Sequence, residues 1–125
     1  MRLFILFVII LTTQHVQAQK MHVVSTYDDG TPEFVVWMKG SAENEKIVKE
    51  EAYFPNGKVE YTGFYKNGVE DGVWTYYYDN GNKKLEETYK AGIEDGVRYE
   101  YAPDGSLRAE FHYKNGQLGK EIRHK

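Results

Sequence analysis

Cysteine is absent from this chain of 125 residues, and proline occurs only three times. Neither a disulfide framework nor a thiolate metal site is therefore available, so stability must come from strand pairing and aromatic burial. Neither charge sign dominates, because 19 acidic and 16 basic residues give a net charge of −3. A nucleic-acid-binding protein usually presents a basic face, so the composition argues against DNA, RNA and anionic lipid as partners.

The first 18 residues have the pattern of a secretory signal peptide. Arg2 gives a positive start, residues 3–11 form an unbroken apolar run, and Val16 and Ala18 place small residues before a cleavage point. The run is too short to span a bilayer, and the alternatives are an uncleaved anchor or a buried strand. Cleavage after Ala18 would leave residues 19–125, exported to the periplasm or the extracellular space without a stable membrane span.

The sequence after this segment repeats with a period of 24 residues. One glycine series recurs at this interval: Gly57, Gly81 and Gly105. A second series interleaves with it: Gly68, Gly92 and Gly116. Self-similarity at a fixed period is typical of a repeat architecture, in which one small unit cannot bury its own face and stacks on its neighbours.

Each repeat predicts two β-strands and two turns. Asn-Gly or Asp-Gly pairs separate segments rich in aromatic and β-branched residues, which is the strongest short-range indication of β-hairpins. In the middle copy the expected strands are residues 73–78 and 83–90. The predicted fold class is therefore all-β: an elongated antiparallel meander of stacked β-hairpin repeats that forms a single-layer sheet.

The expected organisation is a terminal cap followed by the repeats. Residues 19–48 predict a degenerate first repeat with a strand at 34–38, and residues 49–125 hold the remaining repeats with a truncated last unit. Helix competes with strand at residues 41–52, where Glu and Lys are dense. Because the apolar residues there form no helical stripe, we expect a strand preceded by a loop at 40–45.

Charged residues fill positions between the aromatic residues and dominate the C-terminal end. The charges of residues 119–125 would discourage edge-to-edge pairing of the last strand. Pairs of opposite charge recur at the repeat interval and predict solvated ion pairs of a few tenths of a kcal/mol each. They are Lys84 with Glu86, and Arg108 with Glu110.

No catalytic or metal-binding constellation is recognisable. His22, His112 and His124 lack a second ligand at a recognised metal spacing, and no serine lies in a nucleophile elbow. Asp71 and Asp95 recur beside glycine, where turn chemistry accounts for them better than a ladder of calcium sites, since the nonapeptide calcium pattern is absent. We expect no enzymatic activity, no cofactor and no metal.

Aromatic residues give the main indication of binding. Alternation along a strand places Trp74, Tyr76 and Tyr78 on one face and the residues between them on the other. Two tyrosine columns recur at the repeat interval: Tyr53, Tyr77 and Tyr101, and Tyr65, Tyr89 and Tyr113. Whether both columns share a face depends on bulges at the turns. These residues are the candidate contact surface for a protein or for sugar rings; the alternative is that they pack on one another.

The repeated motifs resemble the bacterial MORN-repeat variant. The resemblance rests on Tyr-x-Pro-Asn-Gly-Lys at 53–58, Tyr-Lys-Asn-Gly at 65–68 and Asp-Gly-x-Trp-x-Tyr-Tyr at 71–77, and it covers residues 50–116. It implies stacked β-hairpins without catalysis, and the same repeat recurs in YwqK-type antitoxins of toxin–antitoxin pairs. The chain departs from the pattern at Ala91, Arg98 and Gly119.

Together these features predict an exported, non-enzymatic β-repeat protein that acts by binding. The first expectation is a protein–protein interaction or scaffold module in the periplasm or at the cell surface. One alternative is an antitoxin-like or immunity protein that neutralises a partner toxin. A second alternative is binding of envelope glycan through exposed aromatic rings.

Overall fold

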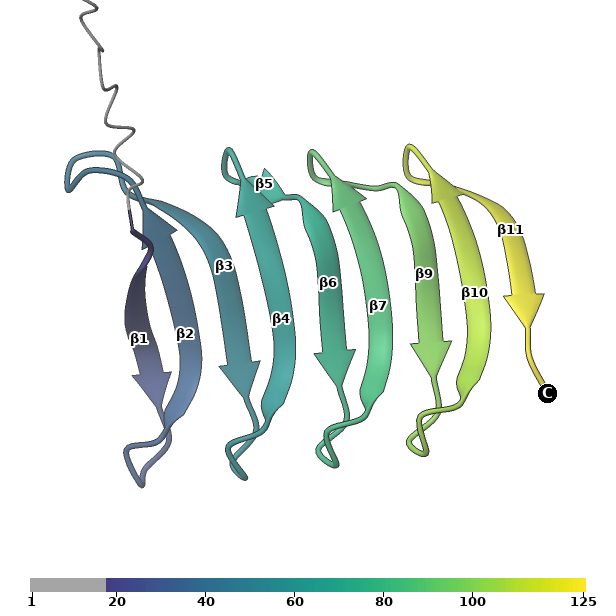
Figure 1. Cartoon of the computed structure of the whole chain (residues 1–125), viewed down its shortest axis with the longest axis horizontal. Helices are drawn as coiled ribbons and strands as arrows, with labels where there is room; N and C mark the ends of the chain where they lie inside the picture. Colours follow the sequence, from purple (N-terminus) through teal and green to yellow (C-terminus); the bar gives the residue numbers. More distant parts are fainter. Residues whose placement is uncertain (1–17) are drawn as a thin grey trace, which may run out of the picture.

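The structure, a computed structural model, describes residues 18–125. Over these residues it forms one open antiparallel sheet without a helix, which confirms the predicted all-β meander (Figure 1). The spatial order is β1-β2-β3-β4-β6-β7-β9-β10-β11, with the short strands β5 and β8 paired to β4 and β7. The strands are β1 (Lys20–Thr26), β2 (Pro32–Lys39), β3 (Lys46–Tyr53), β4 (Val59–Lys66), β5 (Val69–Glu70), β6 (Gly72–Tyr77), β7 (Lys83–Lys90), β8 (Ile93–Glu94), β9 (Gly96–Tyr101), β10 (Leu107–Lys114) and β11 (Gln117–Arg123).

Most of the expected strands appear where the sequence places them. Strand β7 coincides with the prediction for 83–90, whereas β6 begins and ends one residue before the predicted segment 73–78. Strand β3 follows a loop and excludes a helix at 41–52. The predicted signal peptide lies outside the described residues except for Ala18. No helix in the described part of the chain is long and apolar enough to cross a membrane.

The upper turns that follow β4, β7 and β10 in Figure 1 are two-residue hairpin turns with both central residues at positive φ, whereas a longer loop at residues 40–45 joins β2 to β3. Asn67 and Asn115 have φ of 52° and 48°, and each is followed by a glycine at positive φ, as type I′ turns require. Ala91 takes the same conformation with φ of 50°, although alanine is less suited to it than asparagine. The Asp71 carboxylate accepts a hydrogen bond from the Ala91 backbone N–H at 3.1 Å, which ties this turn to the preceding repeat.

Each repeat hairpin contains a bulge beside its lower turn. The register shifts between Ala52 and Tyr53, between Tyr76 and Tyr77, and between Leu107 and Ala109. In each case two residues of the returning strand lie opposite one tyrosine, and a bulge of this kind redirects the extra side chain. The extra residues, which have no partner in the register, are Glu60, Lys84 and Arg108.

Hydrogen bonds between successive turns hold the repeats together at both ends of the strands. At the lower turns, Asn56 Nδ2 donates to the Asp79 carbonyl at 2.9 Å, and Asn80 Nδ2 donates to the Pro103 carbonyl at 2.8 Å. At the upper turns, the Gly92 N–H donates to the Glu70 carbonyl at 2.8 Å. These bonds recur with the repeat, so each hairpin is fixed against the next one and the sheet extends as a unit.

Little of this single layer is buried. The buried apolar side chains of the described residues are Val35, Val36, Trp74 and Ala109. Val35 and Val36 are adjacent on β2 and therefore point to opposite faces, so both faces are partly covered. Stability rests on strand pairing and on aromatic packing along the sheet rather than on a core between two layers.

Candidate functional site

The predicted aromatic residues divide between the two faces of the sheet. Five of them lie on the face of Trp74, which we call the tryptophan face: Trp74, Tyr65, Tyr76, Tyr89 and Tyr113. Tyr53, Tyr77 and Tyr101 lie on the opposite face, which also presents Phe64 and Val73. Tyr78 follows β6 in the lower turn. The two tyrosine columns therefore do not share a face.

Trp74 is a packing residue rather than an exposed contact. Its exposed fraction is 7%, and its ring lies against Tyr61 at 6.2 Å, Tyr65 at 5.4 Å and Tyr89 at 6.1 Å between centroids. The indole N–H donates to the Phe64 carbonyl at 3.2 Å. A Cβ at Gly63 would lie 2.6 Å from two atoms of the indole ring, so the neighbouring strand needs glycine there. The aromatic packing that the sequence left as an alternative thus describes Trp74.

Two carboxylates organise the tyrosine hydroxyls of the tryptophan face. Glu50 accepts from the Tyr61 hydroxyl at 3.0 Å and from the Tyr65 hydroxyl at 3.2 Å. Glu87 is 7% exposed and accepts from Tyr89 at 3.2 Å and from the Arg98 guanidinium at 2.7 Å. These contacts give the hydroxyls of Tyr61, Tyr65 and Tyr89 hydrogen-bond partners and orient their rings, so this part of the sheet has a structural role.

Burial and the same carboxylates hold Tyr65 and Tyr89 in their neutral form by raising the pKa of each hydroxyl. Burial, with the charge of Glu50, raises the pKa of Tyr65 from 10.0 to about 12. Burial, with the charge of Glu87, raises the pKa of Tyr89 from 10.0 to about 12. The hydroxyls therefore remain hydrogen-bond donors well above neutral pH.

We expect the protein to lose stability as the pH rises from 10 to about 12. In this window the tyrosines of the unfolded chain ionise while Tyr65 and Tyr89 stay protonated in the folded chain. The folded state then binds more protons than the unfolded state, so the free energy of unfolding falls with increasing pH. Urea unfolding at several pH values, with tyrosinate absorbance as a second readout, measures this. A free energy of unfolding that stays constant across the window would contradict it.

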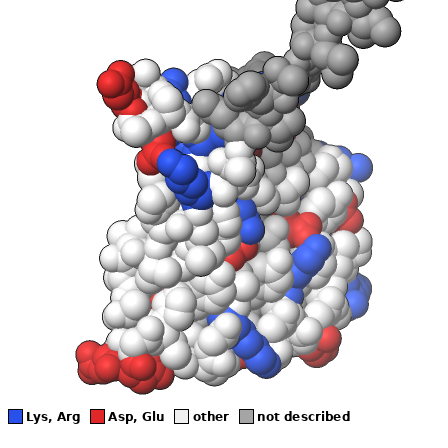
Figure 2. All heavy atoms as spheres, turned by 60° about the vertical axis from the view of Figure 1, so that its left-hand side comes forward, with Lys and Arg blue, Asp and Glu red and all other residues white. Residues whose placement is uncertain are grey.

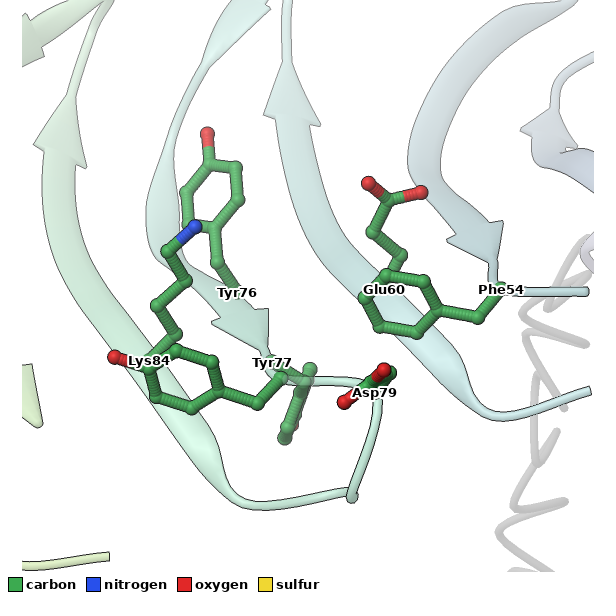
Figure 3. Close-up of a pocket in the computed structure, with 7 residues that line it drawn as sticks. Phe54, Glu60, Tyr76, Tyr77, Asp79 and Lys84 are labelled. Carbon is green, nitrogen blue, oxygen red and sulfur yellow. The ribbon is translucent and has the colours of Figure 1, made fainter. Parts of the chain in front are cut away.

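Two equivalent hollows lie one repeat apart between the lower turns. The first has a volume of about 300 Å³; Phe54 and Glu60 stand on one side of it, and Tyr76 and Lys84 on the other (Figure 3). It is lined by Phe54, Glu60, Tyr76, Tyr77, Tyr78, Asp79 and Lys84. The second has a volume of about 290 Å³ and is lined by Tyr78, Lys84, Leu85, Glu100, Tyr101 and Arg108. The structure thus places three predicted residues around the first hollow, Tyr76, Tyr77 and Tyr78, and two around the second, Tyr78 and Tyr101.

Tyr78 and Lys84 form the ridge between the two hollows, because both residues line both of them. The Tyr78 hydroxyl donates to the Tyr101 carbonyl of the next hairpin at 2.9 Å, and the Lys84 ammonium lies 5.8 Å from the centre of the Tyr78 ring. Tyr27 makes the equivalent bond to the Tyr53 carbonyl at 2.6 Å. Phe54 stands at the same position of the intervening repeat and has no hydroxyl. An aromatic ring thus stands at this position in the lower turns of Tyr27, Phe54 and Tyr78, whereas Ala102 occupies it in the last lower turn.

The charged residues of the hollows have no ionic partner among the described residues. Glu60, Lys84 and Arg108 take part in none of the ion pairs that these residues form. The expected pairing of Lys84 with Glu86 is wrong, because Glu86 pairs with the neighbouring Lys83. The bulge turns Lys84 away from Glu86 and toward the Tyr78 ring.

The second expected ion pair, between Arg108 and Glu110, is also wrong. Glu110 instead contacts His124 at 2.8 Å and His112 at 3.6 Å, which links β10 to the end of the chain. Among residues 18–125, no group of three or more His, Asp and Glu side chains is arranged to hold a metal ion. Arg108 is left facing the second hollow.

Sequence reasoning missed Phe54, Glu60, Lys84 and Arg108 as site residues. The 24-residue period could have indicated three of these residues as a set, because Glu60, Lys84 and Arg108 occupy equivalent positions in successive repeats. Nothing in the sequence showed that a bulge redirects these side chains. Elsewhere, Figure 2 shows acidic and basic groups interspersed on the face it presents, without a continuous basic area.

A second exposed feature, the pair Phe64 and Val73, lies on the face opposite the tryptophan face. Phe64 is 40% exposed and Val73 is 44% exposed, and a Cβ at Gly72, the residue before Val73, would lie 3.7 Å from the Phe64 Cβ. This pair is small compared with a typical interaction patch, and scattered apolar side chains of this kind are normal on protein surfaces. The pair lies outside the hollows and is a comparison surface for them.

A family comparison agrees with this architecture. The family described as MORN repeat variant matches residues 43–67, 70–91 and 94–115. The matched segments correspond to the successive repeats and together cover more than half of the chain. None of the curated proteins matches the chain.

Proposed function

The chain belongs to the MORN repeat variant family, whose members are non-catalytic repeat modules that commonly bind proteins or membranes, and we propose that it binds another protein through the hollows at its lower turns. The observation that supports this proposal most is the repetition of the hollow. Two adjacent copies share an aromatic and cationic ridge, Tyr78 with Lys84. Equivalent subsites side by side suit a long partner segment, which can occupy both at once.

The chemistry of the hollows also favours a protein partner. Their aromatic rings supply contact area at low conformational cost, and their charged groups form no ion pair within residues 18–125. A glycan would be expected to meet a fully exposed ring face, whereas Trp74 is buried and the predicted tyrosines are half-buried. We therefore place protein binding before glycan binding.

Export completes the proposal and rests on the sequence alone. The apolar run at residues 3–11 and the small residues before position 19 favour secretion into the periplasm or beyond. In that compartment the module would act as a scaffold or, alternatively, would neutralise an exported toxin in the manner of an immunity protein. The identity of the captured partner separates these two roles.

The test is a crosslinked capture from the envelope fraction of the source organism, read by mass spectrometry. Three forms are compared: the wild-type chain, the Arg108→Glu variant in a hollow, and the Lys66→Glu variant at the opposite ends of the strands. We expect one stoichiometric protein with the wild type and Lys66→Glu, and its loss with Arg108→Glu. A toxin would support the immunity role. Equal capture by all three forms, or no specific protein at all, would refute binding at the hollows.

A further inference from the structure

The two hollows differ in charge in a way that defines a partner. Glu60 and Asp79 line only the first hollow, Arg108 lines only the second, and Lys84 lines both. Glu100 also lies in the second hollow, where it is outnumbered by the two cations. A ligand that spans both subsites therefore meets carboxylates at one end and cations at the other.

The repeat sets the distance between the subsites. Moving by one repeat crosses two strand spacings, from β4 to β7 by way of β6, which corresponds to about 9.6 Å. The ligand must therefore present two side chains on the same side of its backbone at about this separation. This requirement discriminates between the regular conformations of a bound peptide.

Only one regular peptide conformation satisfies the requirement closely. A polyproline II helix has three residues per turn and rises about 3.1 Å per residue, so residues i and i+3 point the same way about 9.3 Å apart. In a β-strand, same-side residues are about 6.6 Å or about 13 Å apart. In an α-helix, the same-side pair whose separation comes nearest to the required spacing of about 9.6 Å is i and i+7, about 10.5 Å apart. The polyproline II spacing fits best.

We infer that the hollows receive a polyproline II segment of the partner protein that carries a basic side chain and, three residues away, an acidic side chain. The basic group lies at Glu60 and Asp79, and the acidic group lies between Lys84 and Arg108. The Tyr78 ring on the ridge packs against the residues between them, in the way that aromatic rings line grooves for proline-rich peptides. This inference rests on the proposed function and specifies its partner.

The test uses fluorescent synthetic peptides and the full chain, with binding followed by fluorescence polarisation. A proline-rich peptide with the core Arg-Pro-Pro-Glu is compared with Arg-Pro-Glu, which shortens the spacing, and with Arg-Pro-Pro-Arg, which removes the acidic group. We expect saturable binding of the first peptide and at least tenfold weaker binding of the other two. Equal affinity for the shortened peptide, or no saturable binding at millimolar concentration, would overturn the inference.

Charge reversal supplies the matched variants. Arg108 is exposed, so Arg108→Glu should fold normally, and we expect it to weaken Arg-Pro-Pro-Glu at least tenfold and to prefer Arg-Pro-Pro-Arg instead. Lys66→Glu makes the same net change at the upper turns and should leave the affinity within twofold. An unchanged preference in Arg108→Glu would overturn the inference.

This result is distinguishable from failure of the proposed function. If Arg108→Glu abolishes capture of the envelope partner while no peptide of the series binds, the hollows bind protein and the polyproline II assignment is wrong. If neither capture nor peptide binding depends on Arg108, both proposals fail. A partner lost instead on Phe64→Ser would place the interface at Phe64, outside the hollows, and refute both assignments to the hollows.

Discussion

We expect Trp74→Ala to lower the free energy of unfolding by about 3–5 kcal/mol, the range for removing a buried large aromatic side chain. The replacement removes the indole from between Tyr61, Tyr65 and Tyr89 and removes one of the two donors to the Phe64 carbonyl, which keeps the Asp71 N–H at 3.0 Å. A single-layer sheet has no second layer that could collapse into the space. Equilibrium urea unfolding followed by circular dichroism measures the change. A loss below about 1 kcal/mol would mean that the tryptophan face contributes little to stability.

Gly63 provides the matched test of this packing. A Cβ at position 63 would overlap the indole ring, so we expect Gly63→Ala alone to cost about 1–3 kcal/mol through overpacking. In the Trp74→Ala background the added methyl group meets no ring and fills part of the void. The double variant should therefore be more stable than the sum of the two single losses predicts. Additive losses would show that the two positions do not interact.

The repeat architecture could be predicted from the sequence because its evidence is local. The glycine series fixed the period, and the Asn-Gly pairs fixed hairpins whose strands, such as β7, appear at the expected residues. Alternation also placed Trp74 and Tyr76 on one face, as found. Such features depend on a few neighbouring residues, so one sequence is enough to recognise them.

The site was harder to predict because it depends on contacts between neighbouring hairpins. The two tyrosine columns lie on opposite faces, and the bulges beside the lower turns redirect Glu60 and Lys84. Propensity does not reveal an extra residue in one strand. The hydrogen bond from the Tyr78 hydroxyl to the Tyr101 carbonyl likewise connects residues of different repeats. The residues of the hollows were visible as a periodic series, but their convergence was not.

The second large effect is expected at Arg98, where this chain departs from the tryptophan of the preceding repeat. Arg98 lies 2.7 Å from Glu87 and 3.1 Å from Glu94, and its guanidinium lies 5.2 Å from the centre of the Tyr113 ring. Arg98→Ala leaves the buried Glu87 carboxylate without its cation, which we expect to cost about 3 kcal/mol in urea unfolding. Lys114→Ala is the control, because Lys114 is 81% exposed beside Asp95 and should change stability by less than about 0.5 kcal/mol.

A comparison with the preceding repeat shows why Arg98 and Glu87 occur together. Glu87 and Arg98 stand one period after Gly63 and Trp74, so an ion pair replaces an indole lying over a glycine. We expect Arg98→Trp alone to lower the free energy of unfolding, because the Glu87 side chain fills the space that glycine leaves open at the equivalent position 63. Glu87→Gly alone should also lower it, because Arg98 then keeps only Glu94 as an ionic partner. The double variant restores the glycine and the tryptophan of the preceding repeat, with Leu85, Tyr89 and Tyr113 in place of Tyr61, Tyr65 and Tyr89. We expect its stability to lie within about 1 kcal/mol of the wild type, since well-packed apolar groups can replace a buried ion pair without loss. A double variant as unstable as the two single losses combined would show that neighbouring repeats do not exchange these pairs as units.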